Sequence, residues 1–205
     1  MAFLRSGLIG EAYPIIQGRG VHLRPPTSGD YAAWAELRNR SRDHLMPWEP
    51  QWSRDELSRS AFRRRLRHYH REIREDQGYA FFLFRDGDET LLGGLTLSNV
   101  RRGVTQAVSL GYWLGQPYVR RGVMTSAVAA VAPFVFDELK LHRLEAACLP
   151  HNQASIRVLQ LNGFQNEGLA RRYLKIDGQW RDHLLFALLA DDPRTVASVS
   201  GVDRS

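Results

Sequence analysis

The chain has 205 residues, 43% of them hydrophobic and 24% charged, a globular composition that predicts one domain with a sizeable core. No apolar run reaches the roughly 20 residues of a membrane span, and the first twelve residues lack a signal-peptide core, so we expect a soluble, cytoplasmic protein without membrane contact. The single cysteine, Cys148, excludes an internal disulfide framework. The net charge of +6 comes almost entirely from arginine; it fits an anionic cofactor, an RNA-associated partner or a codon preference of the genome.

The first third of the chain predicts an arm, a strand and a helix. Residues 1–18 show no sustained periodicity and are expected to form a flexible arm before a single domain over 19–191, which a tail over 192–205 follows. Val21–Leu23 alternates like a strand. Ser28 is interpreted as the N-cap of a helix that ends near Arg40. Two prolines predict an irregular loop over 45–52.

A second helix is expected over 54–74, because Ser53 and Glu56 are spaced as a capping box before apolar residues at helical intervals. Eight arginines lie in this range. Its outer face is a candidate surface for direct RNA contact. The alternative is a solvated face with Glu72, Glu75 and Asp76 as counter-charges.

From Gly78 onward the pattern changes to strands interrupted by two helices. Pro133 predicts a kink or a break in the first of these helices, and Asp177-Gly178 predicts a tight hairpin turn. The expected strands cover 79–84, 91–100, 106–114, 143–149, 168–176 and 180–189, and the expected helices cover 122–139 and 152–161.

Two local patterns indicate chemistry. The loop between Leu114 and the helix at Gly122 is rich in arginine, and its backbone N–H groups with the helix N-terminus would make a pyrophosphate seat; an ordinary capped helix is the alternative. Asn152 and Ser155 lie one helical turn apart and share a face, although both could simply cap their helix.

The chain resembles the GNAT superfamily of acetyltransferases and, within it, the RimJ-type ribosomal-protein alanine N-acetyltransferases, over about residues 20–190. The resemblance is carried by Pro47-Trp-Glu-Pro50, Leu110-Gly-Tyr-Trp-Leu-Gly115, Arg120-Arg-Gly-Val-Met124, His142-Arg143, Pro150-His-Asn-Gln-Ala-Ser155, Asn162-Gly-Phe164, Glu167-Gly168 and Ile176-Asp-Gly-Gln-Trp-Arg-Asp-His183.

This resemblance implies an α/β (α+β) fold with a mixed, mostly antiparallel central sheet, splayed in the middle and flanked by about four helices. It implies acetyl-coenzyme A as co-substrate and no metal. The pantetheine arm would pair with the backbone of Tyr112, Trp113 and Leu114. The pyrophosphate would lie on the amides of Val119, Arg120, Arg121, Gly122, Val123, Met124 and Thr125, where Val119 and Met124 depart from the family's usual residues.

The resemblance also implies roles in catalysis. Asn152 would contact the pantetheine arm, and Ser155 would lie near the sulfur as a proton donor. Many members carry a tyrosine where Leu159 stands here, which leaves Ser155 as the only acid of this helix.

A terminal α-amino group has a pKa near 7.7–8.0, so a strong base is unnecessary. We expect Trp48 and Glu49 to form the acceptor mouth, with Glu49 as the base directly or through water; the alternative makes Trp48 a core lid and Glu49 a surface residue. Further candidates on the substrate side are Tyr173, Asp182 and His183, of which His183 could equally be a structural strand residue.

The predicted function is transfer of an acetyl group, in a ternary complex, to the N-terminal amine of a protein, with a ribosomal protein's terminal alanine the leading substrate. Two alternatives stay open. The same fold could act on a small amine, or a basic RNA- or ribosome-binding adaptor could have lost catalysis. We expect a monomer or a homodimer.

Overall fold

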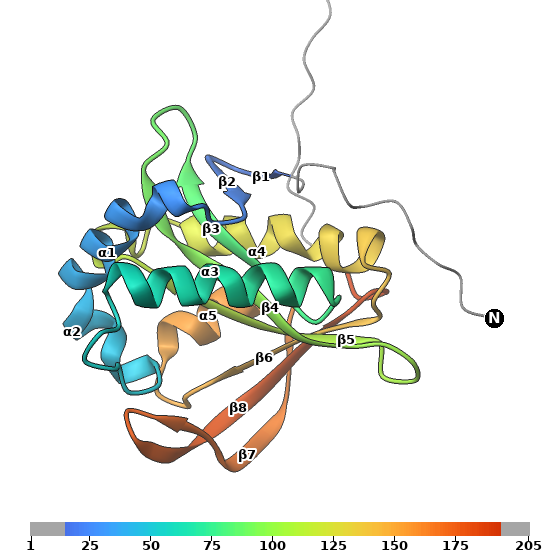
Figure 1. Cartoon of the computed structure of the whole chain (residues 1–205). Helices are drawn as coiled ribbons and strands as arrows, with labels where there is room; N and C mark the ends of the chain where they lie inside the picture. Colours follow the sequence, from blue (N-terminus) through green and yellow to red (C-terminus); the bar gives the residue numbers. More distant parts are fainter. Residues whose placement is uncertain (1–14, 194–205) are drawn as a thin grey trace, which may run out of the picture.

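The computed structural model describes residues 15–193, and one eight-stranded sheet runs through this part of the chain (Figure 1). The strand order is β1-β2-β3-β4-β5-β6-β8-β7. Only β5 and β6 are parallel neighbours, which confirms the expected mixed, mostly antiparallel sheet. The strands are β1 Ile16–Gly18, β2 Val21–Arg24, β3 Tyr79–Arg85, β4 Leu91–Arg101, β5 Ala107–Leu114, β6 Arg143–Cys148, β7 Gln165–Ile176 and β8 Gln179–Leu189.

Helices cover both faces of the sheet, and in Figure 1 α3 crosses in front of the strands while α4 lies behind them. The α-helices are α1 Tyr31–Arg40, α2 Arg42–Leu45, α3 Arg59–Arg74, α4 Val123–Pro133 and α5 Gln153–Leu161. Strand β3 shows why both faces are covered. Its alternate residues Phe82 and Phe84 pack with Trp34 and Phe62 of α1 and α3, whereas Phe81 packs in the cluster that holds α4. A strand that is apolar on both faces is buried on both.

Several predicted boundaries were wrong, among them the start of β7, which lies at Gln165 and not at residue 168. Ile16–Gly18, within the expected arm, pairs with β2, and Ile16 packs against the core; the rest of the arm lies outside the described residues. A 3-10 turn over Ser28–Asp30 precedes α1, so Ser28 does not cap it. The expected loop over 45–52 contains the end of α2 and a 3-10 turn over Met46–Trp48. Pro47 is tolerated there because the first residues of a helix need no N–H donor.

Helix α3 begins five residues later than expected. Ser58 caps it, since its Oγ accepts a hydrogen bond from the Ala61 amide at 3.1 Å. The two carboxylates of the expected capping segment bind arginine side chains instead, Asp55 that of Arg64 and Glu56 that of Arg65, at 2.6 and 2.5 Å. The Ser53 hydroxyl still donates to Asp55 and Glu56, at 2.9 and 3.4 Å, but these contacts hold a turn that precedes the helix.

The break at Pro133 is confirmed. Helix α4 ends at this residue and continues as a π-helical turn over Phe134–Glu138. Proline lacks the amide that would bond one turn back, so the α-helical ladder cannot continue through it. None of the helices in residues 15–193 is long and apolar enough to cross a bilayer.

The sheet splays between β5 and β6, as expected. The two strands pair only where Ala107–Leu110 faces Arg143–Ala146. Beyond this point Gly111–Leu114 pairs with β4 alone. The backbone groups on the other edge of that segment therefore face an open wedge.

Candidate active site

The loop that enters α4 presents unused backbone donors at the mouth of the wedge. Arg120 and Gly122 both have left-handed backbone, with φ of 60° and 75°. The Val119 amide, one of the predicted donors, bonds the Gln116 carbonyl at 3.5 Å instead. The next amide with an acceptor is that of Ser126, which bonds the Gly122 carbonyl at 2.9 Å, so the amides of Val123 to Thr125 have no acceptor in the described chain. A β-carbon on Gly122 would meet nothing within 4 Å. The geometry is that of an anion seat at a helix N-terminus.

The side chains around this anion seat differ in exposure. Arg120 and Arg121 are exposed and add positive charge beside the free amides, whereas Val119 is half-buried. Met124 is 5% exposed and packs in the core, so its departure from the family pattern leaves its amide in place.

Tyr112 and Ser155 connect the two sides of the wedge. The Tyr112 hydroxyl and Ser155 Oγ lie 2.8 Å apart. Asn152 caps α5, because its Oδ1 accepts the Ser155 amide at 3.1 Å. This cap orients the first turn of α5 so that the Ser155 hydroxyl faces β5, so the capping and chemical interpretations of the two residues are compatible.

Burial determines the protonation of this cluster. It raises the pKa of the Tyr112 phenol, so the hydroxyl stays protonated and can donate a proton. Burial also raises the pKa of the Cys148 thiol, and Cys148 is 6% exposed. The cysteine is therefore a neutral strand residue rather than a thiolate nucleophile. Leu159 is fully buried and contributes no polar group.

A cavity of about 470 Å³ lies on the α1 and α3 side of β5, a size typical of ligand sites. Its wall includes Gly111, Tyr112 and Trp113 of β5. The same strand segment thus borders the wedge along one edge and this cavity on one face. The remaining lining residues that carry charge or an aromatic ring are Trp34, Arg38, Glu49, Trp52, Glu56, Arg65, Tyr69, Phe81 and Phe82.

An ion pair between Arg38 and Glu49 occupies the cavity wall. Arg38 donates to both Glu49 oxygens, at 3.1 and 2.5 Å, and the Trp52 Nε1–H donates to Glu49 Oε2 at 2.8 Å. The Arg38 guanidinium lies 4.5 Å from the Trp52 ring and 5.0 Å from the Trp113 ring. It is 5% exposed, and its Nε has no hydrogen-bond partner in the described chain. These contacts hold Glu49 in place.

Neither Arg38 nor the Tyr112 hydroxyl was predicted from the sequence. Arg38 had a usable signal, since it follows Trp34 by four residues and so lies on the apolar face of α1. Tyr112 was expected to act only through its backbone.

The tip of the β7–β8 hairpin reaches the loop that holds Trp48 and Glu49, which we call the acceptor loop. There the Asp177 amide donates to the Glu49 carbonyl at 3.0 Å. Trp48 does not line the cavity; its ring lies 5.4 Å from that of His151, beside the start of α5. The loop therefore extends between the cavity and the wedge.

The three hairpin candidates differ in accessibility. Tyr173 is 49% exposed, and its ring lies 6.0 Å from that of His183, which is 2% exposed. Asp182 Oδ1 accepts the Arg172 amide at 2.8 Å. The structure thus brings Glu49 to the cavity and leaves these three on the hairpin.

A splayed sheet with an amide-rich turn opposite an acceptor cavity defines an acetyltransferase of the GNAT type, and comparison with known families agrees. Residues 21–165 match the acetyltransferase (GNAT) domain family. The chain belongs to this family.

Among similar proteins, the [ribosomal protein uS5]-alanine N-acetyltransferase of Escherichia coli is 36% identical over 80% of this chain and 85% of its own. The probable N-acetyltransferase YjcK of Bacillus subtilis is 34% identical over 87% of this chain and 98% of its own. The crystal structure of Mycobacterium smegmatis RimJ in complex with CoA-disulfide has a TM-score of 0.80 and 35% identity, over 86% of each chain.

Proposed function

We propose that this protein transfers the acetyl group of acetyl-coenzyme A to the N-terminal amine of a protein, with an N-terminal alanine of a ribosomal protein as the leading acceptor. One observation carries the proposal: Gly111, Tyr112 and Trp113 of β5 border both the wedge and the cavity. A donor in the wedge and an amine in the cavity would meet across this strand segment.

The wedge and its loop fit acetyl-coenzyme A. The free amides of Val123 to Thr125 and the exposed Arg120 and Arg121 suit a pyrophosphate. The unpaired edge of Gly111–Leu114 offers the donors and acceptors that pantetheine amides need. The RimJ structure with CoA-disulfide supports this assignment.

The reaction depends on alignment of the acceptor amine with the thioester more than on a strong base. The neutral amine attacks the thioester carbonyl, a C–N bond forms, and the C–S bond breaks as the thiolate leaves. We infer that a backbone N–H of the free β5 edge stabilises the oxyanion in between. The amine's surplus proton leaves toward the acceptor side, and the thiolate takes a proton from the protein.

Ser155 and Tyr112 are the proposed donors to the thiolate. Their 2.8 Å hydrogen bond allows Ser155 Oγ to give its proton to the thiolate while Tyr112 gives its own proton to Ser155. Solvent returns the proton to Tyr112 before the next turnover. The raised pKa of Tyr112 keeps this reserve proton in place at neutral and mildly alkaline pH.

Glu49 is the proposed anchor of the acceptor ammonium. Its carboxylate already accepts three hydrogen bonds from Arg38 and Trp52, and a carboxylate has about four acceptor sites. One further donor can therefore bind, either the ammonium or a water that carries its proton away. Arg38 is a positioning residue that fixes the carboxylate.

The relatives favour a protein acceptor over a small amine, because the Escherichia coli protein's name specifies the alanine of ribosomal protein uS5. The RNA contact expected over 54–74 remains a proposal. Two of its arginines, Arg64 and Arg65, are engaged by Asp55 and Glu56.

The test is incubation with acetyl-coenzyme A and a panel of acceptors, followed by mass spectrometry. The panel holds peptides that start with Ala, Ser or Met, the same peptides with a blocked N-terminus and one internal lysine, intact uS5, and free polyamines. We expect acetylation of unblocked N-termini, fastest for Ala, and none of the blocked peptides. Turnover confined to polyamines would favour a small-amine enzyme, and absence of turnover with all acceptors would favour the adaptor alternative.

A further inference from the structure

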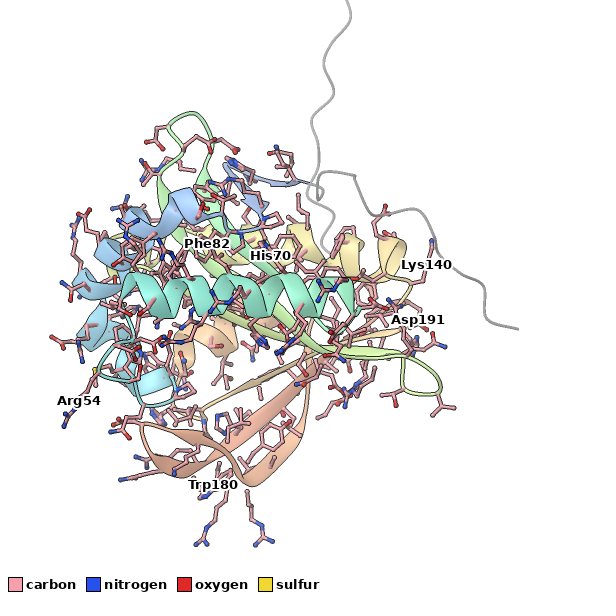
Figure 2. The ribbon with its side chains drawn as sticks, in the orientation of Figure 1. Arg54, His70, Phe82, Lys140, Trp180 and Asp191 are labelled. Atoms are coloured by element: carbon pink, nitrogen blue, oxygen red, sulfur yellow. The ribbon has the colours of Figure 1, made fainter. Side chains whose placement is uncertain are left out.

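The outer part of the β7–β8 hairpin, residues 171–182, exposes large side chains that lie outside the lining of the cavity. We call this segment the hairpin end. Trp180 is 62% exposed, Tyr173 49% and Leu174 41%. Figure 2 shows Trp180 at the foot of the molecule, on the side of the hairpin away from α3. Three large exposed apolar side chains at the end of one hairpin make it a candidate interaction site.

Cations alternate with these apolar groups across the two strands. Trp180 pairs with Lys175, and Leu174 pairs with Arg181. Directly opposite residues of an antiparallel pair lie on the same face, and successive residues of a strand point to opposite faces. Trp180 and Lys175 therefore share one face and Leu174 and Arg181 share the other, so a strand of RNA that contacts both pairs must run around the end of the hairpin.

A bulge adds two arginines to this surface. Ala170 pairs with His183 and Leu174 with Arg181, so three residues oppose the single Asp182. Arg172 has left-handed backbone, with φ of 49°. A bulge bends its strand and changes the direction of the side chains. This bulge also interrupts the free edge of β7. The edge is therefore poorly suited to pairing with another strand.

The positive charge of the hairpin end is not compensated. It has four cationic side chains, Arg171, Arg172, Lys175 and Arg181, against two carboxylates, Asp177 and Asp182. None of the four forms an ion pair with a residue of the described chain. By contrast, Arg143 on the same sheet binds two glutamates. A two-fold contact with a second copy would juxtapose like charges, so a polyanion is the better partner.

We propose that the hairpin end binds single-stranded RNA, with the cations on phosphates and a base stacked on the Trp180 ring. Exposed aromatic rings between cations are what single-stranded nucleic acid needs. Helix α3 fits this role less well, because Phe62 is buried and Tyr69 half-buried. The Asp177–Glu49 hydrogen bond places the hairpin tip beside the acceptor loop, so bound RNA would lie near an incoming protein N-terminus. RNA binding itself does not depend on the proposed acetyl transfer.

The experiment measures fluorescence anisotropy of a labelled single-stranded RNA of about 15 nucleotides, titrated with the full chain at several salt concentrations. Trp180→Ala should weaken binding about 5- to 150-fold at fixed salt, and Trp180→Phe should restore most of the loss. Lys175→Gln with Arg181→Gln should lower the slope of log affinity against log salt by about 1.4, because each single-strand phosphate contact contributes about 0.7. The matched control, Arg63→Gln with Arg67→Gln on α3, removes the same charge and should change binding less.

Urea unfolding midpoints check that each variant folds, and light scattering reports the oligomeric state. Equal or larger losses from the α3 pair would move the RNA surface to that helix and overturn the proposal. A wild-type chain that does not bind the RNA would overturn it as well, as would a dimer that Trp180→Ala dissociates, because the hairpin end would then be a self-contact.

Discussion

At the scale of single residues, catalysis depends on the hydrogen bond between Tyr112 and Ser155. Ser155→Ala and Tyr112→Phe should each lower turnover by about tenfold to a thousandfold with little change in coenzyme A affinity, since a proton donor to the thiolate acts in the transition state. The double variant should be no slower than the slower single one, because the two hydroxyls act as a unit.

Single-turnover kinetics with chemistry shown to be rate-limiting would measure this effect. Because the pKa of Tyr112 is raised, loss of its proton should not reduce turnover below about pH 10, the ordinary tyrosine value. If Tyr112→Phe turned over at the wild-type rate, the hydroxyl would be structural and Ser155 would donate alone.

The proposed role of Glu49 can be tested by measuring how the kinetics depend on pH, because the acceptor amine itself gains or loses a proton near neutral pH. Glu49→Gln should raise the acceptor Michaelis constant and reduce turnover most at low pH, where little of the amine is neutral and removal of its proton matters most. Coenzyme A affinity should not change, because Glu49 lies on the cavity side of β5. Wild-type kinetics across about pH 6 to 9, on both sides of the amine's pKa, would exclude Glu49 from the mechanism.

Arg38 supplies a control for that experiment. Arg38→Lys keeps the charge but loses the two-point contact with Glu49. If Glu49 acts only when it is held in place, this variant should reproduce the raised acceptor Michaelis constant. If Glu49→Gln raises the acceptor Michaelis constant and Arg38→Lys does not, then the charge of the Glu49 carboxylate matters and its exact position does not.

At the scale of elements, the carboxylate of Asp30 joins β2 to α1. It accepts both Arg24 terminal nitrogens, at 2.7 and 2.9 Å, and the Thr27 amide at 2.6 Å. Burial raises the pKa of Asp30, but hydrogen bonds from Arg24 and Thr27 outweigh this effect and hold the pKa below its usual value. The stabilisation is therefore present above about pH 4 and lost as pH falls through the lowered pKa.

We predict that Asp30→Asn lowers the free energy of unfolding at pH 7 by about 1 to 2 kcal/mol, from the lost charge-assisted bonds. The difference from wild type should shrink as pH falls below about 4, where the aspartate of the unfolded chain takes up a proton, and should vanish below the lowered pKa of Asp30 in the folded state. Urea unfolding at both pH values measures it. Asp43→Asn, at an exposed aspartate of α2, is the matched control and should stay within about 0.5 kcal/mol. A difference that persists unchanged at low pH would mean that packing, not charge, causes the loss.

Elements were predictable where their signal is local. The six strands after Gly78 follow from alternation and turn residues, and the Asp177-Gly178 turn has the expected positive φ at both positions, 45° and 75°. The start of α3 was not predictable, because Asp55 and Glu56 bind arginines nine residues away and no short pattern shows such a pairing. The Arg38–Glu49 pair and the Tyr112–Ser155 contact join segments 11 and 43 residues apart. They depend on the tertiary arrangement alone.

At the scale of the whole molecule, the sheet consists of two parts that meet over four residue pairs between β5 and β6. One part holds β1 to β5 and the other β6 to β8. A ligand that bonds to the free β5 edge and to the α4 loop would lie in the open wedge between the two parts. Its binding energy would add directly to the stability of the folded state, because the unfolded chain has no such site.

We therefore predict that coenzyme A at a hundredfold excess over its dissociation constant stabilises the protein by about 2.7 kcal/mol, or about 5 to 10 °C in melting temperature for a domain of this size.

Gly122→Asp should abolish the shift in melting temperature, because it places a negative charge where the pyrophosphate is expected. Gly122→Asn is the matched control: it has the same size and also accepts the left-handed backbone of this position, φ 75°, so it should retain more of the shift. Differential scanning calorimetry of the three proteins with and without ligand decides the matter without any activity measurement. A full shift in Gly122→Asp would place the phosphates elsewhere, and equal loss in both variants would indicate that the backbone, not the charge, was disturbed.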